Sequence, residues 1–246
     1  MAGSIVQSKF NEAAAAATTI ATGSFGSNVT ANNWLWILVN GDVADTTTIT
    51  QNSGTATIGS VTQQSSSIGP GPGILEEWTS LTCQITGTGS LDLLCTFGGS
   101  RSNRQILAFE ISGVTGVDSG GGTSQTDGGS NPTPTLTINV ANQPSFCLAA
   151  CVDYQGGTPG VGTGFTSAGT FGATVHLIRA QTKAVTATGN TTGNFVNGAI
   201  DVNNAAMIVF DEPSTPTISA QPVQQTAASG ATATFNTTTT GATSFQ

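Results

Sequence analysis

The sequence predicts an all-β protein with the architecture of a jelly-roll-like β-sandwich. Apolar residues make up 37% of the 246-residue chain and fall into short runs rich in Val, Ile, Leu and Phe. Stretches of Gly, Ser, Asn and Pro separate these runs, and helical periodicity is limited to a weak pattern around residues 10–17. Short strands at such regular spacing are typical of sandwiches and jelly rolls.

The expected strands follow one another from the start of the chain to residue 211. The run 33–40 is apolar almost throughout, which predicts a central strand covered on both faces. Its Trp34 and Trp36 share one face, and we expect them to pack in the core rather than to stack on sugars. Residues 136–140 alternate between apolar and polar. The other expected strands are 5–8, 18–25, 46–51, 56–63, 75–81, 91–97, 105–111, 146–154, 173–183, 193–196 and 205–210.

Composition also predicts the loops and the domain boundary. Residues 65–73, 119–134 and 156–164 are rich in Gly, Ser and Pro and read as loops. The sequence Asp-Glu-Pro-Ser-Thr-Pro near residue 212 reads as a linker. We therefore expect a β-sandwich domain over 1–211, a linker over 212–216, and an incomplete second β domain over 217–246. Roughly 30 residues are too few to build a sandwich core alone.

Charge excludes two classes of partner. Only 7% of the residues are charged, with five Lys and Arg against 13 Asp and Glu, giving a net charge of −8. An average soluble domain has about 25% charged residues. So few cations predict that the chain binds neither nucleic acid nor an anionic membrane surface. Because no apolar run approaches about 20 residues, we expect no membrane insertion. No signal-peptide pattern opens the sequence, which predicts synthesis in the cytoplasm and release by lysis.

The four cysteines leave two interpretations open. Cys147 and Cys151 share one strand face about 13 Å apart, too far to bond to each other. Cys83 and Cys95 flank a turn and could form a cross-strand disulfide, although four buried free thiols are favoured in a cytoplasmic protein. One histidine and no close ligand pairs predict no zinc site and no cofactor.

The search for catalytic residues yields none that we expect to act. Glu76 and Glu77 stand beside Trp78 and suggest a glycosidase pair. Catalytic carboxylates, however, must face each other across a sugar at roughly 5–9.5 Å, whereas consecutive strand residues point to opposite faces. His176 is the single histidine and lies in an apolar run, so we expect a structural role for it. The sequence therefore predicts a protein that is not an enzyme.

Two pairs of residues are candidates for contacts with other molecules. Trp78 and Tyr154 lie near expected loops and are candidates for stacking on glycans. Arg101 and Arg104 place two of the five cations in one turn, which could dock onto an acidic neighbouring protein. A solvated turn is the alternative for the two arginines, and core packing is the alternative for the aromatic residues.

Most of the chain resembles a β-sandwich unit found in phage structural proteins and bacterial surface proteins. The resemblance spans residues 5 to about 211. It is carried by Ile-Val-Gln-Ser at 5–8, Phe-Gly-Ser-Asn-Val-Thr-Ala-Asn-Asn at 25–33, Ile-Leu-Ala-Phe-Glu-Ile-Ser-Gly-Val at 106–114, Gly-Thr-Gly-Phe-Thr at 162–166, and the strand at 205–210. The Asp-Ser-Ala-Gly-Asn-Thr-Tyr turn common in such units is absent, and Gln-Asn-Ser-Gly-Thr at 51–55 stands near its place.

The last part of the chain is similar to the first strands of a bacterial or phage immunoglobulin-like domain. The resemblance rests on the Gln-Pro pair at 221–222, Gly230, and an alternating Ala-Thr-Ala-Thr-Phe run at 231–235. Phages append such modules to capsid, decoration and tail proteins. The resemblance therefore implies an outward-projecting module.

The resemblances imply a structural component of a bacteriophage virion. The first hypothesis is a capsid decoration or cement protein on the virion surface, bound to the major capsid protein or another virion protein. We expect a symmetric homo-oligomer, with a trimer favoured. The alternative is a tail-fibre or receptor-binding appendage that recognises host surface glycans. A bacterial surface adhesin is a third hypothesis, which the missing signal peptide disfavours.

Overall fold

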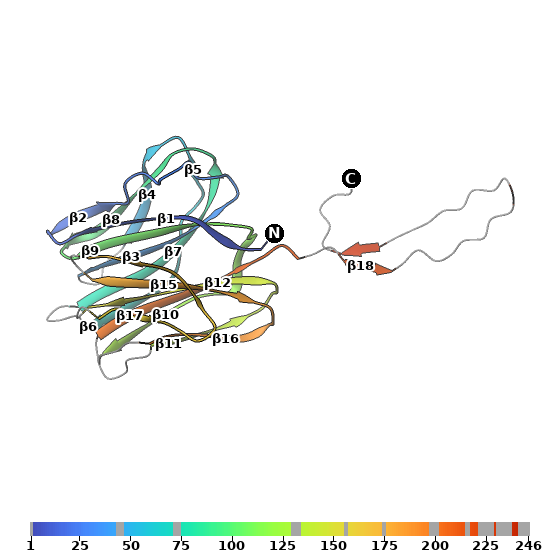
Figure 1. The fold of residues 1–246 in the computed structure, drawn as a ribbon. Coiled ribbons are helices and arrows are strands. Elements are labelled where there is room, and N and C mark those ends of the chain that lie inside the picture. Colours follow the sequence, from blue (N-terminus) through green and yellow to red (C-terminus); the bar gives the residue numbers. More distant parts are fainter. Residues whose placement is uncertain are drawn as a thin grey trace. The chain divides into compact units, whose positions relative to one another are not determined.

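A computed structural model describes residues 2–42, 47–70, 75–128, 134–154, 157–173, 176–196, 202–214, 217–220, 229 and 238–240. The chain divides into two compact units, Met1–Glu212 and Pro213–Gln246, so that the division falls within the predicted linker. Every regular element in the described residues is a β-strand, and the expected all-β sandwich fold is confirmed (Figure 1). The described part of the chain contains no helix long and apolar enough to cross a membrane.

The first unit consists of two halves, each with a large inner sheet and a three-stranded outer sheet. In the first half the inner sheet has the order β1-β9-β3-β7-β5, with β6 also paired to β7, and the outer sheet is β2-β8-β4. The bounds are β1 Ser4–Ala13, β2 Ala17–Ala21, β3 Trp34–Asp42, β4 Thr47–Gly54, β5 Thr57–Ile58, β6 Thr62–Pro70, β7 Leu75–Gly87, β8 Leu91–Arg101 and β9 Arg104–Ser112.

The second half repeats this plan. Its inner sheet has the order β10-β17-β12-β15-β14 and its outer sheet is β11-β16-β13. The bounds are β10 Gly116–Gly128, β11 Thr135–Val140, β12 Ser145–Asp153, β13 Gly160–Val161, β14 Thr166–Phe171, β15 Leu177–Val185, β16 Gly189–Val196 and β17 Val202–Asp211.

Both halves have the same connectivity once the two-residue strand β5 is set aside. In each half the first strand pairs with the last, the second with the second-last, and the third with the third-last, always antiparallel. This nested pairing, folded over into two sheets, is that of a jelly roll. The unit is therefore an internal duplication of one jelly-roll topology, where the sequence led us to expect one large sandwich.

The four sheets stack in layers with three hydrophobic cores between them (Figure 1). The first core lies between the outer and inner sheets of the first half and includes Leu35, Ile37 and Leu93. The central core lies between the two inner sheets and includes Trp36 and Phe210. A third core joins the inner and outer sheets of the second half.

The inner strands are covered on both faces, which explains their apolar sequences. Every residue of β12 is buried, and in β9 only the last residue is not. The central strand expected over 33–40 is confirmed as β3, and Trp36 packs in the core with its indole nitrogen donating to Ser80 Oγ at 2.8 Å. Strands buried on both sides need no polar alternation, as their sequences show.

Two segments expected to be loops are strands. The Ser-rich stretch after residue 64 belongs to β6, and the Gly-rich stretch after residue 118 belongs to β10. β10 pairs with β17 across an irregularity between Val117 and Gly122, where Gly121 has a φ of 68°. Backbone pairing with a strongly apolar neighbouring strand therefore overrides the weak intrinsic preference of Ser and Gly for the β conformation. Residues 46, 71–73, 129–133, 156 and 174–175 of the predicted loops and strands lie outside the described residues.

The cysteines are all free and buried. β7 and β8 belong to different sheets, so that Cys83 and Cys95 do not pair across a hairpin, and the disulfide interpretation is wrong. Cys147 and Cys151 share one face of β12, as predicted, and pack in the third core. Burial raises the pKa of Cys83, Cys95 and Cys147 to about 12.

In the second unit the structure describes one short antiparallel pair. β18, Thr217–Ala220, pairs with β19, Thr238–Thr240. Most of the expected immunoglobulin-like segment over 217–246 lies outside the described residues, including its Gln-Pro pair and the run at 231–235. The immunoglobulin-like assignment therefore stays a prediction.

Candidate functional site

A cluster of polar side chains lies between the two halves, at the ends of strands β3, β9, β12 and β17. The hydroxyl of Tyr154 donates to Asn40 Oδ1 at 3.1 Å and accepts from Asn204 Nδ2 at 2.8 Å. Asn40 in turn donates to Gln105 Oε1 at 3.3 Å, and Gln105 donates to the backbone carbonyl of His176 at 2.7 Å. Asn40 and Gln105 come from the first half, and the other three residues from the second. Below, this network is called the polar seam.

An acid and a base meet at the edge of the polar seam. Glu76 Oε1 lies 3.3 Å from His176 Nε2, and the rings of His176 and Tyr154 pack in a T-shaped arrangement with centroids 4.8 Å apart. The side chain of Glu76 is 1% exposed and that of His176 is 10% exposed. A carboxylate, an imidazole and a phenol so close together could transfer protons. In this structure, however, they are enclosed and have no open cavity beside them among the described pockets.

The adjacent carboxylates Glu76 and Glu77 point to opposite faces of β7, as predicted. Glu76 reaches toward the second half, whereas Glu77 forms an ion pair with Arg101 of β8, with nitrogen and oxygen 3.2 Å apart. Thr79 also donates to Glu77 at 3.2 Å. The geometry therefore does not place the two carboxylates on either side of one substrate, and a glycosidase pair is not formed.

The two arginines that we expected in a docking turn are inside the protein. Arg101 is 2% exposed, pairs with Glu77, and lies over the Phe97 ring at 4.7 Å. Arg104 is 5% exposed and donates to the backbone carbonyls of Thr19 and Ala15. Because their guanidinium groups satisfy internal acceptors, they are not positioned to bind a capsid subunit. The docking-turn hypothesis is wrong for this structure.

The two aromatic residues expected to stack on glycans are also buried. Trp78 is fully buried in the central core, and Tyr154 is 4% exposed and held in the polar seam. Sugar stacking requires one free ring face, which neither residue offers here. The alternative of core packing is therefore correct for both.

A second acidic pair lies where the chain leaves the first unit. Asp118 of β10 accepts hydrogen bonds from the backbone N–H groups of Gly120, Ala141 and Asn142 at 2.8–3.2 Å. Burial acts to raise the pKa of Asp118, but these backbone bonds and a bond with Asp211 outweigh it and lower the pKa. Burial and the neighbouring Asp118 raise the pKa of Asp211 to about 6. Below about pH 6, one proton is therefore shared between two carboxyl groups.

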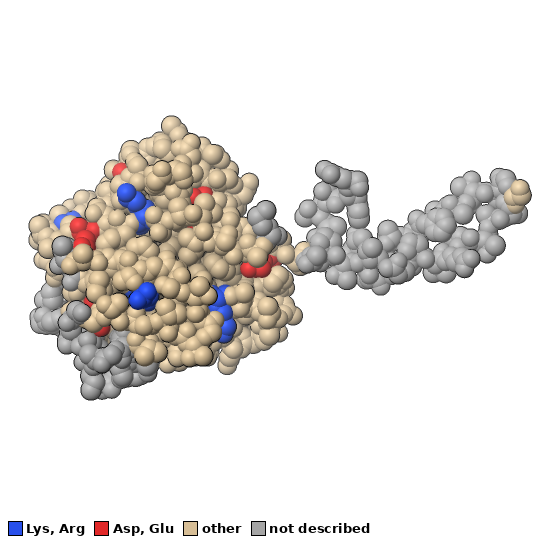
Figure 2. All heavy atoms as spheres, in the orientation of Figure 1, with Lys and Arg blue, Asp and Glu red and all other residues tan. Residues whose placement is uncertain are grey.

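The surface of the first unit has very few charges. Among the residues whose side chains the structure describes, eight charged residues are buried, namely Glu76, Glu77, Asp92, Arg101, Arg104, Glu110, Asp118 and Asp153. Figure 2 shows the charged atoms as isolated spots on a surface of other residues. Hydroxyl and amide groups of Thr, Ser, Asn and Gln supply the polarity instead. Among the described residues, no group of three His, Cys, Asp or Glu side chains is arranged to hold a metal ion.

Sequence reasoning missed the polar seam because its members are far apart in the chain. Asn40 and Tyr154 are separated by 114 residues. One signal was available, since Asn40, Tyr154 and Asn204 each stand at a polar end of an otherwise apolar run. Polar residues at the end of a doubly buried strand indicate that several strands end together. The signal does not say which strands these are.

These features define an all-β protein of the sandwich class, made of two stacked jelly rolls with a sparsely charged surface. No family model, no curated protein and no solved structure matches the chain. The fold and the contacts described above are therefore the basis for a functional proposal.

Proposed function

We propose that the chain is a structural component of a bacteriophage virion, most simply a decoration or cement protein on the capsid exterior. The observation that carries the proposal is the sparsely charged surface of a four-layer β-structure. Jelly rolls are recurrent building blocks of viral shells. The resemblance of residues 5–211 to phage structural units supports the same assignment.

The surface chemistry suits permanent packing against other subunits. Removing a charge from water carries a large desolvation penalty that an ion pair often fails to offset. A surface of hydroxyl, amide and small apolar groups avoids most of that penalty, and the cores of stable interfaces are depleted in charge. With eight charged residues inside the protein, large areas of this unit can meet a neighbour without burying an unpaired charge.

The two residues that suggested the glycan-binding alternative are buried. Trp78 and Tyr154 have roles in the central core and the polar seam. We therefore do not argue for a tail-fibre lectin, although a location on the tail is one of the outcomes of the test below.

The test is immunogold electron microscopy of purified particles with antibody against residues 2–212. A decoration protein places gold evenly over the heads, and recombinant full chain then binds to particles stripped of the native protein. Pre-immune serum, and antibody absorbed with the recombinant chain, are the controls. Gold confined to the tail would contradict the cement role, and particles that lack the chain by mass spectrometry would overturn the virion assignment.

A further inference from the structure

The outer sheet of the first half ends in an uncapped edge strand. β4 pairs with β8 on one side, and no described strand pairs with its other side. β5 and β6, which follow β4 in the chain, pair with β7 of the inner sheet instead. A sheet edge of this kind presents backbone N–H and C=O groups that are free to pair with another strand.

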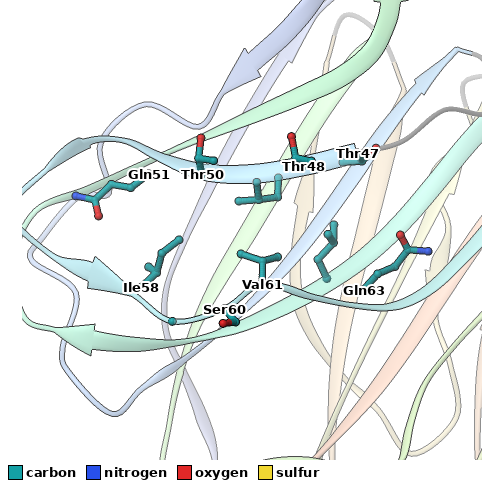
Figure 3. Close-up of a pocket in the computed structure, with 11 residues that line it drawn as sticks. Thr47, Thr48, Thr50, Gln51, Ile58, Ser60, Val61 and Gln63 are labelled. Carbon is teal, nitrogen blue, oxygen red and sulfur yellow. The ribbon is translucent and has the colours of Figure 1, made fainter.

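A groove runs along this edge. It has a volume of about 610 Å³ and is bounded by the β4 residues 47–51 on one side and by residues 58–63 on the other. Five strand residues extend over about 16 Å. Figure 3 shows the side chain of Val61 directed into the groove, whereas Thr48 and Thr50 point away from it. The groove is therefore as long as a short extended peptide and has a sheet edge as one wall.

The lining of the groove is apolar at its floor and uncharged throughout. Ile49 and Leu81 belong to the first core, and Ile58 and Val61 are partly buried against it. The remaining lining residues are Thr, Ser, Gln and Gly. A charged side chain entering the groove would lose water without gaining a partner. Apolar side chains at alternate positions of an extended chain would instead cover the floor.

In the second half, a side chain crosses the corresponding gap between the edge strand β13 and the inner sheet. There Gln181 of β15 accepts a hydrogen bond from Gly162 N at 2.8 Å and donates to Asn194 O at 2.9 Å. Its fully buried side chain thus bridges the inner sheet to the end of β13 and to β16. In the first half, apolar Leu81, Ile58 and Val61 lie in the gap and make no such bridge. The duplicated fold therefore has one sealed gap and one open gap.

We propose that the groove between β4 and residues 58–63 is a docking site for an extended, uncharged peptide segment of another protein, which adds to β4 as a fourth strand of the outer sheet. Main-chain hydrogen bonds to the edge give affinity, and apolar side chains at every second position select the segment. The inference does not rest on the proposed virion role, because it follows from the geometry of the isolated unit.

The first test measures peptide binding to the full-length chain. The probe is a fluorescein-labelled peptide, Thr-Val-Thr-Val-Thr-Val-Thr, with blocked termini. The expected result is saturable binding by fluorescence polarisation, with hydrogen-exchange protection gained at the amides of residues 47–51. An analogue N-methylated on every residue, which has no backbone N–H group to donate to the edge, should bind at least tenfold more weakly. A second analogue with Lys in place of each Val should also bind at least tenfold more weakly.

Two protein variants test whether the peptide binds in the groove. Val61→Lys puts a charge on the groove floor and should weaken peptide binding at least tenfold, whereas Thr18→Lys, at an exposed position of β2 on the other edge of the outer sheet, should leave it within twofold. Because Val61→Lys could perturb folding, the N-methylated analogue tests the same idea on the unaltered chain. Equal affinity for the N-methylated peptide, or protection away from residues 47–51, would overturn the proposal. A dimer that forms through β4 and blocks the peptide would overturn it in favour of a second copy as occupant.

Discussion

The hydroxyl of Tyr154 donates a 3.1 Å hydrogen bond to the side-chain carbonyl of Asn40, from one jelly roll to the other. The same oxygen accepts a hydrogen bond from Asn204 at 2.8 Å, so that one phenol hydroxyl bonds to two buried side-chain amides. The apolar core between the inner sheets packs the two halves against each other. The polar seam adds directional hydrogen bonds between them.

Tyr154→Phe should destabilise the unit by about 1–3 kcal/mol, because both amides lose a buried partner while the ring remains. The measurement is urea-induced unfolding followed by tryptophan fluorescence. Thr50→Val, at an exposed position of β4, is the control and should stay within about 0.5 kcal/mol. An unchanged unfolding midpoint for Tyr154→Phe would show that the polar seam contributes nothing to stability.

Arg101→Ala should be among the most damaging single substitutions. It leaves the carboxylate of Glu77 buried without its ion-pair partner, which typically costs about 3–5 kcal/mol. Replacing both residues, as Glu77→Leu with Arg101→Met, should recover much of the loss because no charge is left behind. Chemical denaturation of Arg101→Met, Glu77→Leu and the double variant completes the cycle. The expectation fails if Arg101→Ala costs no more than Lys9→Ala on β1 of the inner sheet.

Gly162→Ala should destabilise the second half by about 1–3 kcal/mol through overpacking. A Cβ at residue 162 would lie 1.9 Å from the backbone oxygen of Asn194, which cannot rotate away. Gly26→Ala is the matched control, because a Cβ there meets nothing within 4 Å. Thermal unfolding of both variants gives the comparison, and equal melting temperatures would contradict the close approach of β13 and β16.

The Asp118–Asp211 pair predicts a pH dependence of stability. The pKa of Asp211 is raised to about 6 from an ordinary value of 3.8, so that folding favours its protonated form. The stability that the raised pKa of Asp211 gives to the folded state is fully present below pH 3.8 and is lost as the pH rises through 6. The pKa of Asp118 is lowered, and its own contribution is present above pH 3.8 and lost on acidification.

Stability of the wild-type chain should therefore fall between pH 4.5 and pH 7.5 by more than that of Asp211→Asn, in which no carboxyl group titrates at this position. Urea unfolding at several pH values measures the difference. Glu212→Gln, one residue further on, is the control and should keep the wild-type profile. Parallel profiles for the wild type and Asp211→Asn would show that the two carboxyl groups do not share a proton.

The sequence was sufficient to predict the fold class and most strands, because doubly buried strands such as β3 and β12 have no other reason to be so apolar. It was not sufficient for β6 and β10. Their Ser and Gly residues are weak strand formers, and only pairing with β7 and β17 makes them strands. The duplication was also hidden, since it repeats the connectivity of the strands and not their residues.

The candidate site residues were predicted less well than the fold, for an electrostatic reason. Arg101 and Arg104 stand in a turn-like sequence, which favours exposure. Their acceptors, Glu77 and the carbonyls of residues 15 and 19, lie 24 to 89 residues away in the chain. Burial of an arginine depends on such distant partners. Local composition therefore predicts the turn correctly but not the direction of its side chains.

The double burial of the inner sheets has a consequence for the order of events on the ribosome. When the first half has been synthesised, its inner sheet still exposes to water the face with Trp36, Leu38 and Phe109, which only the second half covers. About 100 further residues must emerge before that face is protected. The nascent first half is therefore expected to be an aggregation-prone species that needs a holding chaperone or rapid elongation, although the finished protein hides every one of those side chains.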